Sequence, residues 1–177
     1  MAKHSPTAET ASYLSGPAYA VALLFVVFPI VDTVAQVWPL QLDSPSWRYG
    51  AIGLGANYLI SALFGMLGMA LVAALRQHRR VLLGVTLLSG LGALLLLVAA
   101  LSFVLDVFQV RAGVPRNDPR TLWLFDVGAA KAELKYLVGA GLLAWQGLMG
   151  WKAWRTIDRP ELTAEEEAPR LVSKQQK

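Results

Sequence analysis

Apolar residues in this chain are gathered into blocks long enough to cross a bilayer. Residues 49–75 carry no charge, and as a helix rising about 1.5 Å per residue they would span roughly 40 Å. The hydrocarbon core of a bilayer is about 30 Å thick. Similar apolar blocks occupy residues 17–37, 81–108 and 134–155. The pattern predicts an all-α integral membrane protein, built as a bundle of four transmembrane helices.

Small residues recur at helical spacing within the second and fourth blocks. In lipid, burial against leucine brings no hydrophobic gain, so small side chains that let helix backbones approach closely favour association. We therefore interpret five glycines as helix-packing positions: Gly53, Gly65, Gly68, Gly147 and Gly150.

The first and third blocks end alike, with VDTVAQV around Asp32 and LDVFQV around Asp106. Such a match is expected of a repeated helical hairpin, although a match this short also arises by chance. The sequence leaves two arrangements open, a pair of related helical hairpins or four unrelated helices.

Tryptophan and arginine mark the ends of the blocks. Indole rings favour the headgroup level of a bilayer, so the tryptophans at the block ends are predicted to be interfacial anchors: Trp38, Trp47, Trp123, Trp151 and Trp154. The turn RQHRR between the second and third blocks contains Arg76, Arg79 and Arg80. The positive-inside rule assigns this turn to the cytoplasm, and four crossings then place both termini there, in the cell (inner) membrane.

Polar segments flank the apolar blocks. Residues 1–16 are short and lack the layout of a cleavable signal, so we expect a flexible cytoplasmic arm. Residues 156–177 contain prolines and a run of glutamates, which predicts a cytoplasmic tail that is disordered or lies on a surface. The four-helix transmembrane domain is predicted to occupy residues 17–155.

Residues 122–136 mix apolar and charged side chains just before the fourth block. This pattern predicts a short amphipathic helix at the outer interface, or an extension of the last helix beyond the bilayer. Lys131 and Lys135 share one face of such a helix. They would meet lipid phosphates, a partner's carboxylates or the aspartates below them, and we favour the phosphates.

Composition agrees with a membrane protein and argues against several chemistries. The chain is 55% hydrophobic and only 16% charged, against roughly a quarter charged in an average soluble domain. It contains no cysteine, which removes disulfides and thiolate metal sites. Its histidines, His4 and His78, lie outside the apolar blocks, so we expect no haem, zinc site or serine–histidine pair at membrane depth. No catalytic, metal or cofactor residue is predicted, although lipids or pigments held non-covalently remain compatible.

One polar side chain per apolar block falls roughly 7 to 15 Å inside the outer end by helix rise. An ionisable group at such depth is costly unless it is paired, protonated or wet. We predict one hydrogen-bonded cluster that pins the bundle, with a proton, ion or small-molecule pathway as the alternative. Its members are Asp32, Asn57, Asp106 and Gln146.

Three function classes follow from these features. The leading one is a non-catalytic accessory subunit that stabilises a larger membrane complex of respiratory, photosynthetic or secretion type. The second is a small transporter or proton-conducting protein that uses Asp32 and Asp106. The third is a membrane enzyme acting on lipid. The expected partners are the lipid bilayer and other membrane subunits. The net charge of +4 arises from basic clusters beside apolar blocks, so nucleic acid is not expected.

Overall fold

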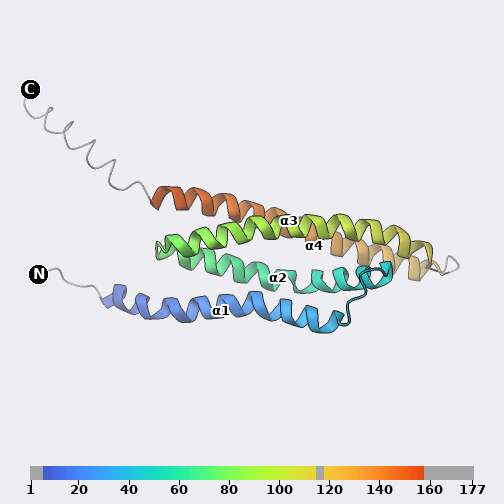
Figure 1. Cartoon of the computed structure of the whole chain (residues 1–177), viewed down its shortest axis with the longest axis horizontal. Helices are drawn as coiled ribbons and strands as arrows, with labels where there is room; N and C mark the ends of the chain where they lie inside the picture. Colours follow the sequence, from blue (N-terminus) through green and yellow to red (C-terminus); the bar gives the residue numbers. More distant parts are fainter. Residues whose placement is uncertain (1–5, 115–117, 158–177) are drawn as a thin grey trace, which may run out of the picture.

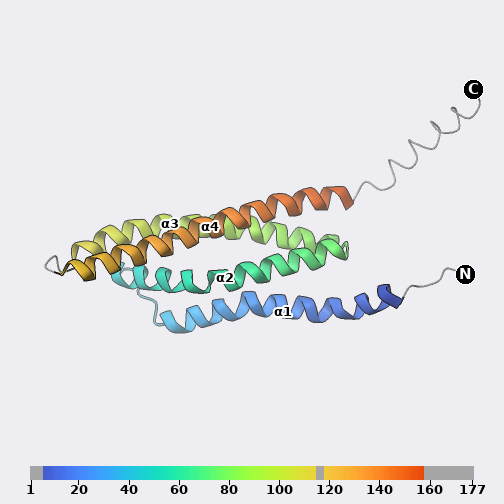
Figure 2. The same ribbon diagram turned by 180° about the vertical axis from the view of Figure 1, so that it is seen from behind.

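The protein is described by a computed structural model that covers residues 6–114 and 118–157, with side chains from Ser15 onward in the first helix. Within these residues the chain forms four helices, α1 (Pro6–Val37), α2 (Pro45–Leu75), α3 (Arg79–Ala112) and α4 (Pro119–Ile157). They lie side by side with alternating direction (Figures 1 and 2). The expected all-α, four-helix bundle is confirmed.

The bundle has two distinct ends. The start of α1, the end of α4 and the turn between α2 and α3 lie together at one end, which we call the turn end (Figure 1). The connections α1–α2 and α3–α4 lie at the opposite end, the loop end. There α2, α3 and α4 extend beyond the last turn of α1 (Figure 2).

Three of the four helices are long and apolar enough to cross a membrane, namely Ser15–Val37 within α1, the whole of α2 and the whole of α3. A multi-pass membrane protein is therefore supported. The remaining helix, α4, is not among these candidate spans, because charged side chains follow one another along its first half and tryptophan and glutamine interrupt its second half.

Two boundaries differ from the sequence-based expectation. Helix α1 already begins at Pro6 and continues through Pro17, so the predicted arm 1–16 is helical from Pro6 onward. A proline within a helix removes a single backbone hydrogen bond, and the alanine, glutamate and threonine before it are compatible with helix. Residues 122–136 form no separate interfacial helix. They are the first part of α4, which no proline interrupts between Pro119 and Ile157.

Helix α2 is the centre of the bundle. It packs against α1, α3 and α4, and α3 in turn packs along the length of α4. The extensive contacts of α1 are with α2. Helix α1 is therefore the peripheral helix, and most of its surface faces away from the bundle.

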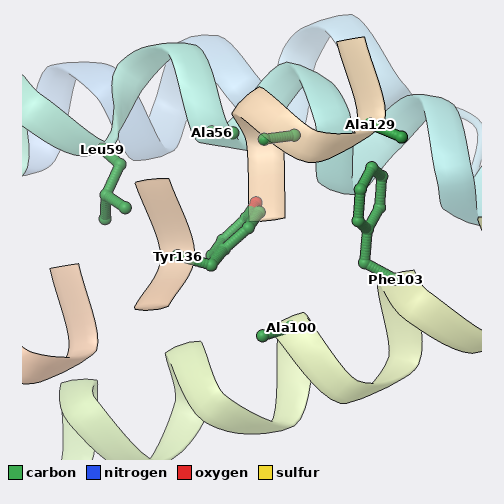
Figure 3. Packing of buried hydrophobic residues seen from close by; sticks show 7 residues of the cluster. Ala56, Leu59, Ala100, Phe103, Ala129 and Tyr136 are labelled. Atoms are coloured by element: carbon green, nitrogen blue, oxygen red, sulfur yellow. The ribbon is translucent and has the colours of Figure 1, made fainter. Parts of the chain in front are cut away.

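The core between α2, α3 and α4 combines small residues with two large rings (Figure 3). Ala56, Ala100 and Ala129 come from the three helices and surround Phe103 and Tyr136. Phe103 is 1% exposed. Small side chains on the facing helices leave the space that these rings fill, so the three helices are held together by specific packing. A second cluster of Met66, Val85, Ala93 and Leu143 continues this core toward the turn end.

The five glycines interpreted as packing positions differ in how closely they are packed. A Cβ atom at Gly65 would lie 2.6 Å from the carbonyl oxygen of Ala22 in α1, and one at Gly150 would collide with the hydroxyl of Thr86 in α3. At Gly68 and Gly147 the nearest atoms would be at ordinary contact distances of 3.4 and 3.6 Å, and at Gly53 at 3.9 Å. Three further glycines are closely packed: Gly55, Gly92 and Gly139.

Candidate functional site

The polar residues predicted to form one cluster occupy separate places in the bundle. Within the described residues, each of Asp32, Asn57, Asp106 and Gln146 bonds to a group outside this set. Depth along a helix alone suggested that they meet, but contact also depends on how each helix is rotated. The structure thus has four local contacts in place of the predicted cluster.

Asp106 of α3 forms an ion pair with Arg48, in the first turn of α2. Arg48 Nη2 lies 2.6 Å from Asp106 Oδ1, and Arg48 Nε donates to both carboxylate oxygens at 3.2 and 3.0 Å. The Asp106 residue is only 2% exposed. A bidentate guanidinium is the partner that makes such burial of a carboxylate tolerable.

The same arginine fixes the connection between α1 and α2. Arg48 Nη1 donates to the carbonyl of Leu42 at 2.7 Å, and the indole N–H of Trp47 donates to the carbonyl of Val37 at 3.2 Å. Ser44 caps α2 by accepting a hydrogen bond from the backbone N–H of Trp47 at 3.4 Å. Trp47 therefore links the start of α2 to the end of α1, in addition to being a predicted anchor.

Asp32 of α1 lies between α1 and α2 and has no cation among its hydrogen-bond partners in the described residues. Its carboxylate accepts hydrogen bonds from Tyr58 and Gln36. Gln36 Nε2 also donates to the hydroxyl oxygen of Tyr58 at 2.8 Å. The three side chains form a small polar network that joins the two helices near the end of α1.

Pro29 opens a gap in the backbone hydrogen bonds of α1, and α2 fills it. Proline lacks the N–H that would bond to the carbonyl of Phe25, four residues earlier. Ser61 Oγ of α2 donates to this carbonyl at 3.3 Å. The hydroxyl of Thr33 donates to the carbonyl of Pro29 itself at 2.7 Å. Satisfying a freed carbonyl from a neighbouring helix is how a proline is tolerated at membrane depth.

Within the part of the chain that the structure describes, helices α2 and α4 are joined by three polar contacts. Lys135 Nζ donates to the amide oxygen of Asn57 at 2.9 Å, and Gln146 Nε2 donates to the carbonyl of Met66 at 2.9 Å. Lys135 therefore meets a neutral amide and not one of the two aspartates. The hydroxyl of the buried Tyr136 donates to the carbonyl of Ile52.

The turn end carries a layer of aromatic rings and basic groups. The Arg79 guanidinium carbon lies 4.7 Å from the centre of the Trp154 ring, and the Arg155 carbon lies 5.1 Å from that of Trp151. The two indoles stack at 5.0 Å. The hydroxyl of Tyr19 is 3.0 Å from Nδ1 of His78. This composition is typical of a membrane interface.

The α3–α4 connection is stabilised by two exposed aspartates. Arg111 forms two hydrogen bonds with Asp126, at 2.7 and 2.8 Å, and they hold the pKa of the Asp126 carboxyl below its ordinary value. Asp118 caps α4 by accepting from the hydroxyl and backbone N–H of Thr121 and the backbone N–H of Arg120. These bonds lower the pKa of Asp118 as well.

An apolar groove of about 810 Å³ lies between α1 and α2. Three small residues form part of its lining, Ala18 and Ala22 from α1 and Gly68 from α2. Val21 and Leu71 also line it, and their side chains are 53% and 57% exposed. The groove is therefore open on the outside of the bundle, and Ala22, which is 7% exposed, lies at its floor where α1 packs against α2.

Sequence reasoning missed the residues that partner the predicted ones. Arg48 and Tyr58 were not singled out, although they bind Asp106 and Asp32. Arg48 did carry a signal, because an arginine in a segment predicted to lie outside runs against the positive-inside rule unless it has a structural role. Tyr58 and Ser61 carried none, since hydroxyl groups within apolar blocks are common.

The described residues contain no group of three or more histidine, aspartate or glutamate side chains placed to hold a metal ion. Comparison of the chain with models of protein families, with curated proteins and with solved structures finds no match.

Proposed function

We propose that this protein is a non-catalytic integral membrane subunit that binds a transmembrane helix of another membrane protein in the groove between α1 and α2. The observation that carries the proposal is the groove itself. It is apolar, about 810 Å³ in volume and lined by Ala18, Ala22 and Gly68. Lipid chains gain little from small residues, whereas a helix gains close backbone contact.

The peripheral position of α1 supports the same proposal. Helix α1 packs extensively against α2 only, and its candidate span Ser15–Val37 is the least buried of the three. A helix held on one side is expected either to face lipid all round or to complete its packing in an assembly. The small-residue lining of the groove favours the second outcome.

All four helices cross the bilayer in this proposal, α4 included. Helix α4 runs antiparallel to α3 along its length (Figure 2), so it shares the depth of a helix that is apolar enough to span. Lys135 and Trp154 in α4 are separated by roughly 28 Å of helix rise. That distance is close to the hydrocarbon thickness of about 30 Å.

This placement puts the turn end at the inner face of the cell (inner) membrane and both ends of the helical domain in the cytoplasm. The tight turn with Arg76, Arg79 and Arg80 supports this orientation through the positive-inside rule. At the loop end, Arg48 and Arg111 bind Asp106 and Asp126. These outer arginines therefore have structural partners that account for their position.

The ion pair of Asp106 argues against the transporter as the leading function. A carboxylate that carries protons must exchange them with water, whereas Asp106 is buried and bound to Arg48 through several hydrogen bonds. Asp32 remains as the one candidate carboxylate for that second function, because its partners are Tyr58 and Gln36 and not a cation.

The proposal is tested by comparing the proteins that co-purify with the wild type and with a variant in which a larger side chain fills the groove. The protein is extracted from its native membrane in mild detergent, and the masses that accompany it are determined. Val21→Trp at the edge of the groove should release the stoichiometric partner, because the added ring occupies the groove. Leu94→Trp on the exposed surface of α3 is the matched control and should retain it. A partner retained equally by both variants, or a protein that is alone in the wild type, would contradict the proposal.

A further inference from the structure

A second groove runs between α2 and α4 on the outside of the bundle. Its inner part has a volume of about 430 Å³, and apolar side chains of both helices line it, Trp145 among them. Its outer part, toward the loop end, has a volume of about 340 Å³ and is lined in part by Asn57, Lys131 and Lys135. Lys135 lines both parts. The two hollows thus follow one another along the same pair of helices.

The outer part of this groove contains two lysines, Lys131 and Lys135. Lys135 Nζ donates to the neutral amide of Asn57, and Lys131 is exposed. Neither lysine belongs to an ion pair in the part of the chain that the structure describes. Asp126 and Glu133 line a different hollow, which lies against α3. The groove therefore presents positive charge at one end and an apolar channel at the other.

The length of the groove matches one leaflet of a bilayer, if α4 crosses the membrane as proposed above. In that placement Lys135 lies near the level of the outer phosphates. Trp145 lies roughly 15 Å deeper by helix rise, which is about the middle of the hydrocarbon core. The apolar part of the groove therefore spans the depth that an acyl chain of the outer leaflet occupies.

We propose that this groove binds one anionic phospholipid, with its phosphate against Lys131 and Lys135 and an acyl chain along α2 and α4 as far as Trp145. The hydrogen bond to Asn57 holds the Lys135 ammonium group at the mouth of the groove, where an anionic headgroup would meet it. A zwitterionic lipid brings its own cation to the same place, so the site prefers a lipid with net negative charge.

Native mass spectrometry of the full-length protein in mild detergent tests the headgroup preference. Phosphatidylglycerol and phosphatidylcholine with identical chains are added separately, and the fraction of lipid-bound protein is measured. We expect the wild type to retain phosphatidylglycerol more strongly, and each of Lys131→Gln and Lys135→Gln to weaken this retention about fivefold. Lys152→Gln, an exposed lysine at the turn end, is the control and should leave it unchanged. Equal retention by all variants would overturn the proposal.

A second measurement locates the acyl chain and does not depend on mass spectrometry. Lipids brominated in the middle of their chains quench nearby tryptophan, and the part due to Trp145 is obtained by difference from a Trp145→Phe variant. We expect brominated phosphatidylglycerol at low mole fraction to quench Trp145 more than brominated phosphatidylcholine, and Lys135→Gln to remove the difference. Equal quenching by both lipids would overturn the lipid site alone. If neither lipid quenches Trp145, no acyl chain reaches this residue, and the lipid site is overturned. That result would also mean either that α4 does not cross the membrane or that another protein surface covers the groove.

Discussion

Arg48 and Asp106, which lie 58 residues apart in the chain, form the ion pair that closes the loop end of the bundle. The arginine comes from the first turn of α2 and the aspartate from α3, and Arg48 also donates to the carbonyl of Leu42 in the α1–α2 connection. One side chain therefore joins two helices and a loop at a point where the carboxylate is almost completely buried.

Removing the arginine should destabilise the protein strongly. In Arg48→Gln the carboxylate of Asp106 stays buried without its cation, and we expect the free energy of unfolding to fall by about 3 kcal/mol or more. Replacing both residues by leucine should recover much of this loss, because no buried charge is then left unpaired. Unfolding in detergent, followed by circular dichroism, provides the measurement. Arg111→Gln breaks an exposed pair and should have little effect. A similar small effect for Arg48→Gln would show that the buried pair contributes nothing.

The glycines of α2 should differ sharply in their tolerance of alanine. A methyl group at Gly65 would lie 2.6 Å from the backbone of α1, so Gly65→Ala should force the helices apart at a cost of about 1 to 3 kcal/mol. At Gly68 the nearest atom would be 3.4 Å away, and Gly68→Ala should be nearly neutral. Thermal unfolding of the two variants makes the comparison. Leu97→Phe, at a 44% exposed position of α3, is the control for added bulk. Equal stability of both alanine variants would contradict the observed α1–α2 contact.

The number and order of the helices could be predicted because each apolar block is long enough to cross a bilayer as one helix. The amphipathic pattern of residues 122–136 allowed two predictions, a separate interfacial helix or an extension of the last helix. The charged residues of this segment suited both equally well. The structure has the extension, because nothing in this segment stops a helix. Likewise, the helical domain was predicted to begin at residue 17, but residues before it are compatible with helix, and α1 begins at Pro6.

The partners of the polar residues could not be predicted in the same way. Helix rise gives the depth of Asp106 and Asn57 but not the rotation of α3 or α2 about its own axis. Rotation decides that Asp106 meets Arg48 and that Asn57 meets Lys135. It is fixed by the packing of small residues around Phe103 and Tyr136 in the core, which depends on all three helices at once.

Acid should weaken the α3–α4 connection. The hydrogen bonds from Arg111 lower the pKa of Asp126 in the folded protein, so this pair stabilises the α3–α4 connection locally at pH values above the unfolded pKa of about 3.9. The contribution is lost as pH falls through the lower, folded pKa. Protease cleavage near residue 117, measured between neutral and acidic pH with an acid-tolerant protease, should therefore rise at the acid end. Asp126→Asn should be cleaved more readily already at neutral pH and should change less on acidification. A wild-type profile parallel to that of the variant would contradict this role.

Single cysteines should report the orientation of the bundle in intact cells, because the chain contains none of its own. We expect an impermeant thiol reagent to label Asp43→Cys and Ala112→Cys at the loop end, and to reach Gln77→Cys only after the membrane is permeabilised. Gln77 already has a φ angle of 53°, so cysteine replaces one side chain by another in the same backbone conformation. Asp43 is preferred to Ser44 as a probe, because Ser44 caps α2. Labelling of Gln77→Cys alone in intact cells would reverse the proposed orientation.

Substitutions of Asp32 distinguish the proposed subunit function from the alternative transporter function. If this carboxylate serves the contact between α1 and α2, Asp32→Asn should be nearly neutral, because an amide oxygen can still accept hydrogen bonds from Tyr58 or Gln36. Asp32→Leu should reduce assembly, since it leaves both polar side chains without their shared acceptor. If the carboxylate carries protons, Asp32→Asn should fold normally and lose the flux, because an amide does not exchange a proton in this pH range. Complex yield and proton flux in reconstituted vesicles are therefore measured side by side for both variants, with Val34→Ala as a control at an exposed position of the same helix. We expect normal assembly and unchanged flux for Asp32→Asn, and reduced assembly for Asp32→Leu. A folded Asp32→Asn protein that has lost a flux present in the wild type would reject the subunit and establish the transporter in its place.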